Sequence, residues 1–108
     1  MTHFQLGEHY LAISTLSRAV HEDPKDPRAR NYLAVALRQK GWIDGAEEEL
    51  HKALEADETF AEAHFNLALI CLERQTPAIE SARRHYFRAI ELGAQPDKLI
   101  EKQLSSGN

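Results

Sequence analysis

The feature that most constrains this chain is an internal repeat with a period of 34 residues. The stretch GEHYLAISTLSRAVHEDP aligns with GWIDGAEEELHKALEADE, and small or apolar residues coincide along it. A repeat of this length indicates stacked structural units, each of which buries its apolar face against its neighbours. The coincident pairs are Gly7 and Gly41, Ala12 and Ala46, Leu16 and Leu50, Ala19 and Ala53, and Asp23 and Asp57.

The same offset continues into the next segment, and a third copy follows it. In the third copy the offset grows to 36 residues, and the two extra residues fall within RQTPAIES, between two expected helices. Loops tolerate such insertions better than helices do. At the offset of 34, Ala29, Leu33, Ala34 and Leu37 match Ala63, Leu67, Ala68 and Cys71; at 36, Ala46, Leu50, Ala53 and Leu54 match Ala82, Tyr86, Ala89 and Ile90.

The composition indicates a soluble, helical, single domain. Of the 108 residues, 43% are hydrophobic and 28% are charged, and Ala, Leu and Glu outnumber Val, Thr and Gly, which favours helix. The net charge of −4 argues against partners such as nucleic acid or an anionic membrane, because both need a basic face. No apolar run approaches the roughly 20 residues of a membrane span. The single thiol and the absence of a signal-like N-terminus favour a cytoplasmic location.

Capping and turn residues place the expected helices. Asp26 followed by Pro27 is typical of an N-cap and the first position of a helix. Gly93 is expected to adopt the left-handed conformation that ends a helix. The expected helices span residues 1–6, 8–22, 27–40, 43–56, 60–74, 77–92 and 96–104.

The helix expected at 43–56 is unusually rich in small residues. Gly45, Ala46 and Ala53 stand where a free helix would carry larger apolar groups, which indicates that neighbouring helices pack closely against it. Ala34 and Ala46 are expected to let the backbones of two crossing helices approach each other. Gly41 is expected to allow the tight turn between those helices.

These repeats resemble the tetratricopeptide repeat family, whose 34-residue unit is a helix-turn-helix with small residues at the helix crossing. The resemblance covers residues 1 to about 94. It implies an all-α fold, an α-solenoid of antiparallel helix pairs in a right-handed superhelix with a C-terminal capping helix. The single domain of residues 1–108 would comprise a partial repeat 1–26, repeats 27–60 and 61–94, a capping helix 95–104 and a tail 105–108. The residues that carry the resemblance are Leu33, Ala34, Gly41, Ala46, Leu50 and Ala53 in one repeat, and Leu67, Ala68, Ala82, Tyr86 and Ala89 in the next.

Catalytic, metal and cofactor motifs are not evident in the sequence. The six histidines include no pair at the i,i+3 or i,i+4 spacing that places two ligands on one helical face, so they are interpreted as solvated side chains. Cys71 occupies a core position and is expected to be a small buried apolar residue. Without a phosphate-binding loop or a nucleophile elbow, we expect no enzyme activity and no cofactor.

The resemblance implies that a protein or peptide partner binds in a concave groove lined by the first helix of each repeat. On the helix 27–40 the inward stripe is polar and basic, whereas on the helix 60–74 it is mainly apolar. Because the second helix already has a core face at Leu67, Ala68 and Cys71, something must also cover this apolar stripe. The stripes are Arg28, Asn31, Val35 and Arg38 on the first helix, and Glu62, Phe65, Leu69 and Leu72 on the second.

Three hypotheses account for the apolar stripe. The C-terminal helix folds over part of it through Leu99 and Ile100. Alternatively, the stripe receives a partner peptide or helix whose acidic groups pair with Arg28, Arg38 and Lys98. The third hypothesis is self-association through the same surface.

The front of the chain and one family motif add further alternatives. Leu11, Leu16 and Val20 lie on a helix with only a short stub to cover them, which favours either a fragment of a longer repeat array or a homo-oligomer.

Some members of the family bind a C-terminal carboxylate through Lys, Asn and Arg residues at set groove positions. If the capping helix is read as the start of a fourth repeat, Asn66, Lys98 and Lys102 fall on three such positions. The positions one repeat earlier hold Asn31 and Val35, where Lys and Asn would be expected, so the clamp would be incomplete.

Overall fold

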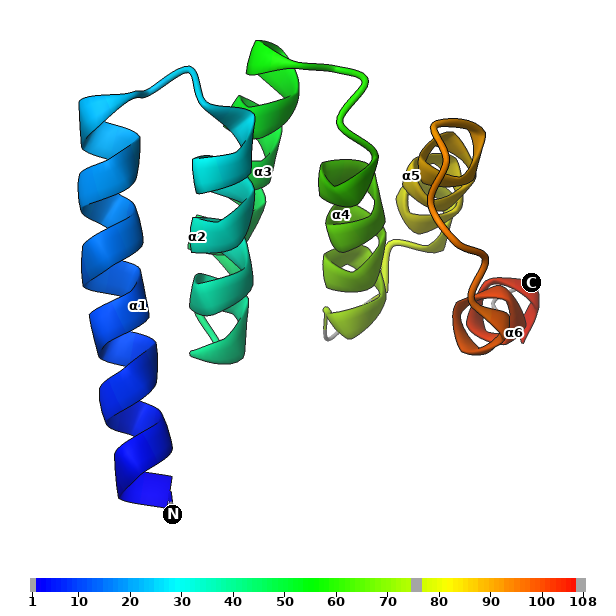
Figure 1. The fold of residues 1–108 in the computed structure, drawn as a ribbon. Coiled ribbons are helices and arrows are strands. Elements are labelled where there is room, and N and C mark those ends of the chain that lie inside the picture. Colours follow the sequence, from blue (N-terminus) through cyan, green and yellow to red (C-terminus); the bar gives the residue numbers. More distant parts are fainter. Residues whose placement is uncertain (1, 75–76, 107–108) are drawn as a thin grey trace. The chain divides into compact units, whose positions relative to one another are not determined.

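The computed structural model describes the backbone of residues 2–74 and 77–106 and the side chains of residues 11–74 and 77–105. Helices are the regular elements throughout these ranges (Figure 1), which confirms the all-α prediction. The chain forms two compact units, residues 1–58 with α1 to α3 and residues 59–108 with α4 to α6. The helices are α1 (Thr2–Glu22), α2 (Pro27–Gln39), α3 (Ile43–Ala56), α4 (Ala61–Glu73), α5 (Ile79–Glu91) and α6 (Lys98–Ser106).

The observed helices α2 to α6 begin and end within two residues of the predicted bounds, but α1 differs. It runs without a break through Gly7, so the predicted stub and turn are wrong. A glycine in a helix interior costs only about 1 kcal/mol relative to alanine, and it becomes necessary only where the backbone takes a positive φ angle. The match of Gly7 to Gly41 in the repeat therefore did not imply the same conformation.

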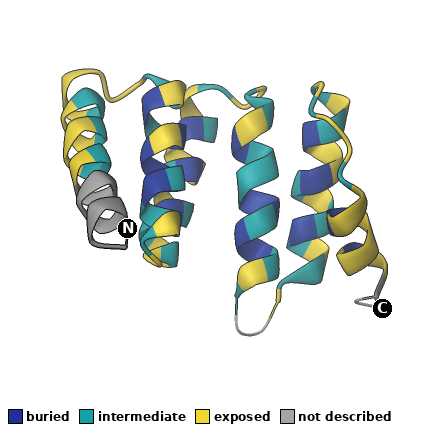
Figure 2. Cartoon of the chain, turned by 60° about the horizontal axis from the view of Figure 1, so that its bottom comes forward, coloured by how far each residue is buried: buried dark blue, intermediate teal, exposed yellow. Residues whose placement is uncertain are grey.

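In the first unit, α2 packs against both α1 and α3. The Asp26 side chain caps α2 by accepting a hydrogen bond from the backbone N–H of Arg28 at 2.9 Å, and Pro27 occupies the first helical position, as predicted. Ala34 and Ala46 are both buried, as the close approach of α2 and α3 requires. Buried residues recur along α2 to α5 (Figure 2), with exposed residues between them on α2, α3 and α5 and half-buried residues between them on α4. The alternation on α2, α3 and α5 is the pattern of amphipathic helices.

Two glycines have a positive φ angle, at the tight turn predicted for Gly41 and at the left-handed helix end predicted for Gly93. The φ angle is +89° at Gly41, between α2 and α3, and +108° at Gly93, after α5. Gly45 is different, because a Cβ built there would meet only Leu37 Cδ1, at an ordinary van der Waals distance of 3.7 Å. A methyl group would therefore fit at position 45, although it would already be in contact with α2.

Alanine substitutions at Gly41 and Gly45 are expected to have opposite effects on stability. Gly41→Ala should lower the free energy of unfolding by about 1 kcal/mol, because an L-residue is strained at positive φ although space is available for its Cβ. Gly45→Ala should raise it by about 0.5–1 kcal/mol, because Gly45 lies in a helix and has room for a methyl group. Urea denaturation of both variants measures the two effects, and an equal loss in both would contradict the assignment.

In the second unit, α4 packs against α5, and α5 packs against α6. Cys71 is a buried thiol in the shared core, which confirms its predicted role as a small apolar residue. The core cluster draws on all three helices and therefore ties α6 to the helix pair. Its buried members are Ala68, Cys71, Ala82, Tyr86, Ile100 and Leu104.

Candidate partner-binding site

The predicted stripe on α2 is only partly open to solvent. Arg28 is exposed, and Val35 and Arg38 are half-buried. Asn31 is only 1% exposed, so it is a buried polar residue and offers no surface to a partner. Among the described residues, every buried side-chain nitrogen or oxygen has a hydrogen-bond partner, which is the condition for burying an amide without a large energetic penalty.

The predicted stripe on α4 is largely occupied within the second unit. Glu62 is exposed, but Phe65, Leu69 and Leu72 are half-buried and pack against the core cluster. The ring of Phe65 lies 6.2 Å from that of Tyr86, measured between centroids. The apolar character of the stripe is therefore explained in large part by the core of this unit.

Helix α6 contributes to that core in a register different from the predicted one. Ile100 and Leu104 are both 3% exposed, whereas Leu99 is 75% exposed. Residues four positions apart share a helical face, and the adjacent Leu99 points about 100° away from it. The prediction that Leu99 helps to cover the stripe is therefore wrong. Lys98, at the start of α6, is exposed as the groove hypothesis requires.

A polar network around Tyr86 fastens the start of α6 to α5. The Tyr86 hydroxyl donates a hydrogen bond to Glu101 Oε2 at 2.6 Å and accepts one from the backbone N–H of Asp97 at 2.9 Å. Asp97 Oδ1 in turn accepts hydrogen bonds from the backbone N–H groups of Leu99 and Ile100. Burial, followed by the hydrogen bond to Glu101, raises the pKa of Tyr86 above its ordinary value of 10.0.

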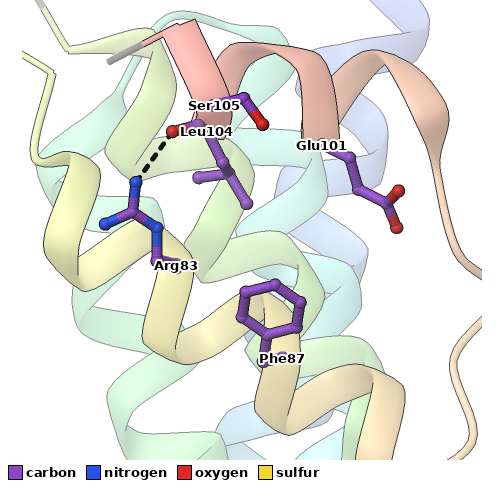
Figure 3. Close-up of a pocket in the computed structure, with 5 residues that line it drawn as sticks. All are labelled: Arg83, Phe87, Glu101, Leu104 and Ser105. Carbon is purple, nitrogen blue, oxygen red and sulfur yellow. Dashed lines mark hydrogen bonds between the residues drawn. The ribbon is translucent and has the colours of Figure 1, made fainter. Parts of the chain in front are cut away.

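An open cavity of about 480 Å³ lies between α5 and α6. Figure 3 shows the Arg83 guanidinium and the Phe87 ring on one side, facing residues of α6. Arg83 donates one hydrogen bond to the carbonyl oxygen of Leu104 at 2.8 Å and forms an ion pair with Glu80 at 2.8 Å. The cavity is therefore lined by the apolar ring of Phe87 and by the Arg83 guanidinium, which already forms contacts within the protein. Its lining residues are Arg83, Phe87, Glu101, Leu104 and Ser105.

Two histidines from different helices meet in the second unit. The Nδ1 atoms of His64 on α4 and His85 on α5 lie 3.3 Å apart, and both side chains are half-buried. The interpretation of the histidines as solvated is therefore wrong for this pair. Within residues 2–74 and 77–106 no group of three or more His, Cys, Asp or Glu side chains is arranged to hold a metal ion.

Over the same ranges, no helix has the length and apolar character that crossing a membrane requires.

Comparison with known proteins identifies the repeat. The family model of the tetratricopeptide repeat matches residues 3–64 of the chain. The chain belongs to the tetratricopeptide repeat family. Its α-solenoid of helix pairs is the fold of that family.

A curated relative supports the assignment of this tetratricopeptide chain. The chain is 32% identical over 82 residues to the TPR repeat-containing thioredoxin TTL4 of Arabidopsis thaliana. The match covers 76% of this chain but only 12% of that protein, so the chain spans a small part of its relative's length.

Solved structures share the tetratricopeptide fold at lower sequence identity. The first TPR of Spaghetti (RPAP3), bound to the HSP90 peptide SRMEEVD, has a TM-score of 0.80 at 20% identity and covers 97% of this chain and 81% of its own. The first TPR domain of human RPAP3, determined by NMR, has a TM-score of 0.80 at 21% identity, with coverages of 97% and 86%. A double mutant of MamA RS-1 has a TM-score of 0.71 at 22% identity, with coverages of 82% and 49%.

The residues for which the resemblance implied a carboxylate clamp are only partly suited to that role. Lys98 and Lys102 are exposed, and Asn66 is half-buried. On α2, however, Asn31 is buried and Val35 has no polar side-chain atom. A clamp on a terminal carboxylate would therefore lack its contacts on α2.

Sequence reasoning about this tetratricopeptide chain missed the His64–His85 pair and the contact between Tyr86 and Glu101. The repeat itself held a signal for the first. His64 lies 34 residues after Arg30, and His85 lies 36 residues after Glu49, the offsets of the second and third copies. Arg30 and Glu49 form an ion pair at 2.8 Å across α2 and α3. Repeat equivalence therefore places His64 and His85 where Arg30 and Glu49 meet in the preceding repeat, and this is the signal that could have predicted the pair.

Proposed function

We propose that this chain is a non-catalytic protein-interaction module that binds an acidic peptide or helix along the first helices of its repeats. The partner would contact α2 through Arg28, Val35 and Arg38. In the second unit, taken by itself, the proposed contacts are Glu62 and the exposed parts of Phe65, Leu69 and Leu72 on α4, and Lys98 on α6.

The observation that carries the proposal is the similarity, over 97% of the chain, to a TPR domain bound to the peptide SRMEEVD. At 20% identity this similarity concerns the fold, so the choice of partner rests on the residues of this chain. Among the proposed contact residues, Arg28 in the first unit and Lys98 in the second are exposed cations, in a protein whose net charge is −4. Local positive charge on an acidic protein favours an acidic segment of the partner.

Charge reversal at Arg28 tests the proposal. Arg28→Glu is expected to weaken partner binding by about tenfold or less, and the loss should shrink as salt is added, because exposed charges are screened. A carboxylate in the first turn of α2 interacts favourably with the helix dipole, so stability should not fall. The measurement is a pull-down with immobilised protein, in which the partners recovered by wild type and variant are quantified at two salt concentrations.

Arg18→Glu provides the matched control, because Arg18 is an exposed cation on α1 of the same unit. It should leave partner recovery unchanged. Equal recovery by wild type and Arg28→Glu, or an equal loss in both variants, would contradict a site on the exposed face of α2.

Self-assembly is the second candidate function. It is favoured by Leu11 on α1, which is 68% exposed, since an uncovered apolar side chain of this size is a potential contact for another copy. In the same pull-down, recovery of the chain itself as the main partner, lost on Leu11→Ser and retained in Arg28→Glu, would favour self-assembly over the peptide-binding proposal.

A further inference from the structure

The His64–His85 pair is a contact between two side chains of the same type at a position where the preceding repeat has an ion pair. In that repeat, Arg30 Nη1 lies 2.8 Å from Glu49 Oε1, and Arg30 Nε also donates to the carbonyl oxygen of Pro24 at 2.8 Å. These contacts pair a cation with acceptors. At the equivalent positions of the next repeat, two imidazole rings face each other instead.

The two imidazole rings approach each other through their Nδ1 atoms. The Nδ1 atoms of His64 and His85 lie 3.3 Å apart, while the ring centroids lie 5.5 Å apart and the ring planes are tilted by 31°. Neutral imidazoles can share one proton across this distance, with one ring as donor and the other as acceptor. Both residues are half-buried, so neither is sealed from solvent.

The separation of the two nitrogens is the one expected for two ligands of a tetrahedral zinc ion. With Zn–N distances of 2.0–2.1 Å, two ligands at the tetrahedral angle lie about 3.3–3.4 Å apart, whereas adjacent ligands of an octahedral ion at the same bond length lie about 2.9 Å apart. Imidazole nitrogen is also a preferred ligand of zinc, and it binds magnesium or calcium poorly.

We propose that His64 and His85 ligate one Zn²⁺ ion through their Nδ1 atoms and so join α4 to α5. The ring that donates the shared hydrogen bond changes tautomer on binding, because its proton moves to Nε2 and frees the Nδ1 lone pair. Water fills the other two tetrahedral positions, in agreement with the absence of a third His, Cys, Asp or Glu ligand among the described residues. With only two protein ligands, the site is exchangeable and its zinc is removable by a chelator.

Thermal unfolding of untagged, chelator-treated protein tests the site. A molar excess of ZnCl₂ is expected to raise the Tm of the wild type by about 5 °C, because an ion that binds only the folded state stabilises it. The rise should disappear in His64→Gln and in His85→Gln, and MgCl₂ should give none. The matched control is His51→Gln, which removes an exposed histidine of α3 and should retain the full rise.

A second measurement needs no variant. Co²⁺, a paramagnetic ion that adopts the same tetrahedral geometry as zinc, should broaden the imidazole NMR signals of His64 and His85 in the wild type before those of the other histidines. The proposal is supported if these two signals are lost first and if excess zinc restores them. It is overturned if zinc leaves the wild-type Tm unchanged, if either glutamine variant that folds keeps the rise, or if Co²⁺ acts first on other histidines.

Discussion

Replacing Tyr86 by alanine is expected to lower the free energy of unfolding by about 3–5 kcal/mol, the range for removing a large aromatic side chain from a core. Tyr86 is fully buried, and its ring lies beside those of Phe65 and Phe87. Its hydroxyl also holds Glu101 and the backbone of Asp97, so the substitution removes both apolar packing and the polar attachment of α6. Urea denaturation followed by circular dichroism measures the loss.

Two controls separate the contributions at this position. Tyr86→Phe keeps the ring and should cost only about 1–2 kcal/mol, because it removes the hydroxyl and leaves Glu101 without that hydrogen bond. Phe87→Ala removes a neighbouring ring that is 52% exposed and should cost about 1 kcal/mol, much of it from the edge-to-face contact with Tyr86. If Phe87→Ala lowered the free energy of unfolding as much as Tyr86→Ala does, this would contradict the conclusion that Tyr86 is the main aromatic residue of the core.

Because the pKa of Tyr86 is raised, the difference in stability between wild type and Tyr86→Phe should depend on pH. In the unfolded chain the phenol ionises near pH 10, whereas in the folded protein burial and Glu101 hold it neutral to higher pH. The stabilising contribution is therefore fully present below pH 10 and is lost as pH rises from there through the folded-state pKa. The stability difference between wild type and Tyr86→Phe should shrink above pH 10, and a constant difference would contradict the assigned cause.

Ala46→Leu is expected to lower the free energy of unfolding by about 1–3 kcal/mol, the second large effect. Ala46 is 0% exposed on α3, and the helix pair α2–α3 is among the most closely packed in the chain. Three added carbon atoms must push the helices apart or force neighbouring side chains out of their preferred rotamers. The change should appear as a lower urea midpoint.

The matched control is Ala56→Leu, the same substitution at the exposed end of α3. It should change stability by less than about 0.5 kcal/mol, because nothing packed is displaced. If Ala46→Leu is equally mild, the close approach of the two helices at position 46 is not what selects alanine there.

Much of the fold could be predicted because the repeat presents similar helix-capping and turn residues more than once along the chain. Asp26–Pro27 predicted the start of α2, and the positive φ angles of Gly41 and Gly93 followed from where the turns had to be. The prediction failed at Gly7, where the same residue type lies inside a helix. Local sequence states which conformations glycine can adopt, but the surrounding packing selects among them.

The candidate site was less accessible to sequence reasoning. The stripe with Phe65 and Leu69 was correctly recognised as an apolar surface that something must cover, and packing against the core cluster accounts for much of it. The choice of Leu99 as a covering residue was wrong, since the helical register of α6 turns Leu104 inward instead. That register depends on the contacts of Tyr86 with Asp97 and Glu101, which join residues 11 and 15 positions apart.

By itself, the sequence determined the family, the helical repeat and the positions of the small residues, because these properties follow from periodicity and from backbone preferences along one helix. Only the tertiary structure decided that Asn31 is buried, that Leu104 rather than Leu99 completes the core, and that His64 and His85 face each other. These outcomes depend on how side chains of different helices meet, which is set by helix register and rotamer. The physical reason is that periodicity assigns a residue to a face of its helix, whereas contact distances between helices arise only when the faces pack.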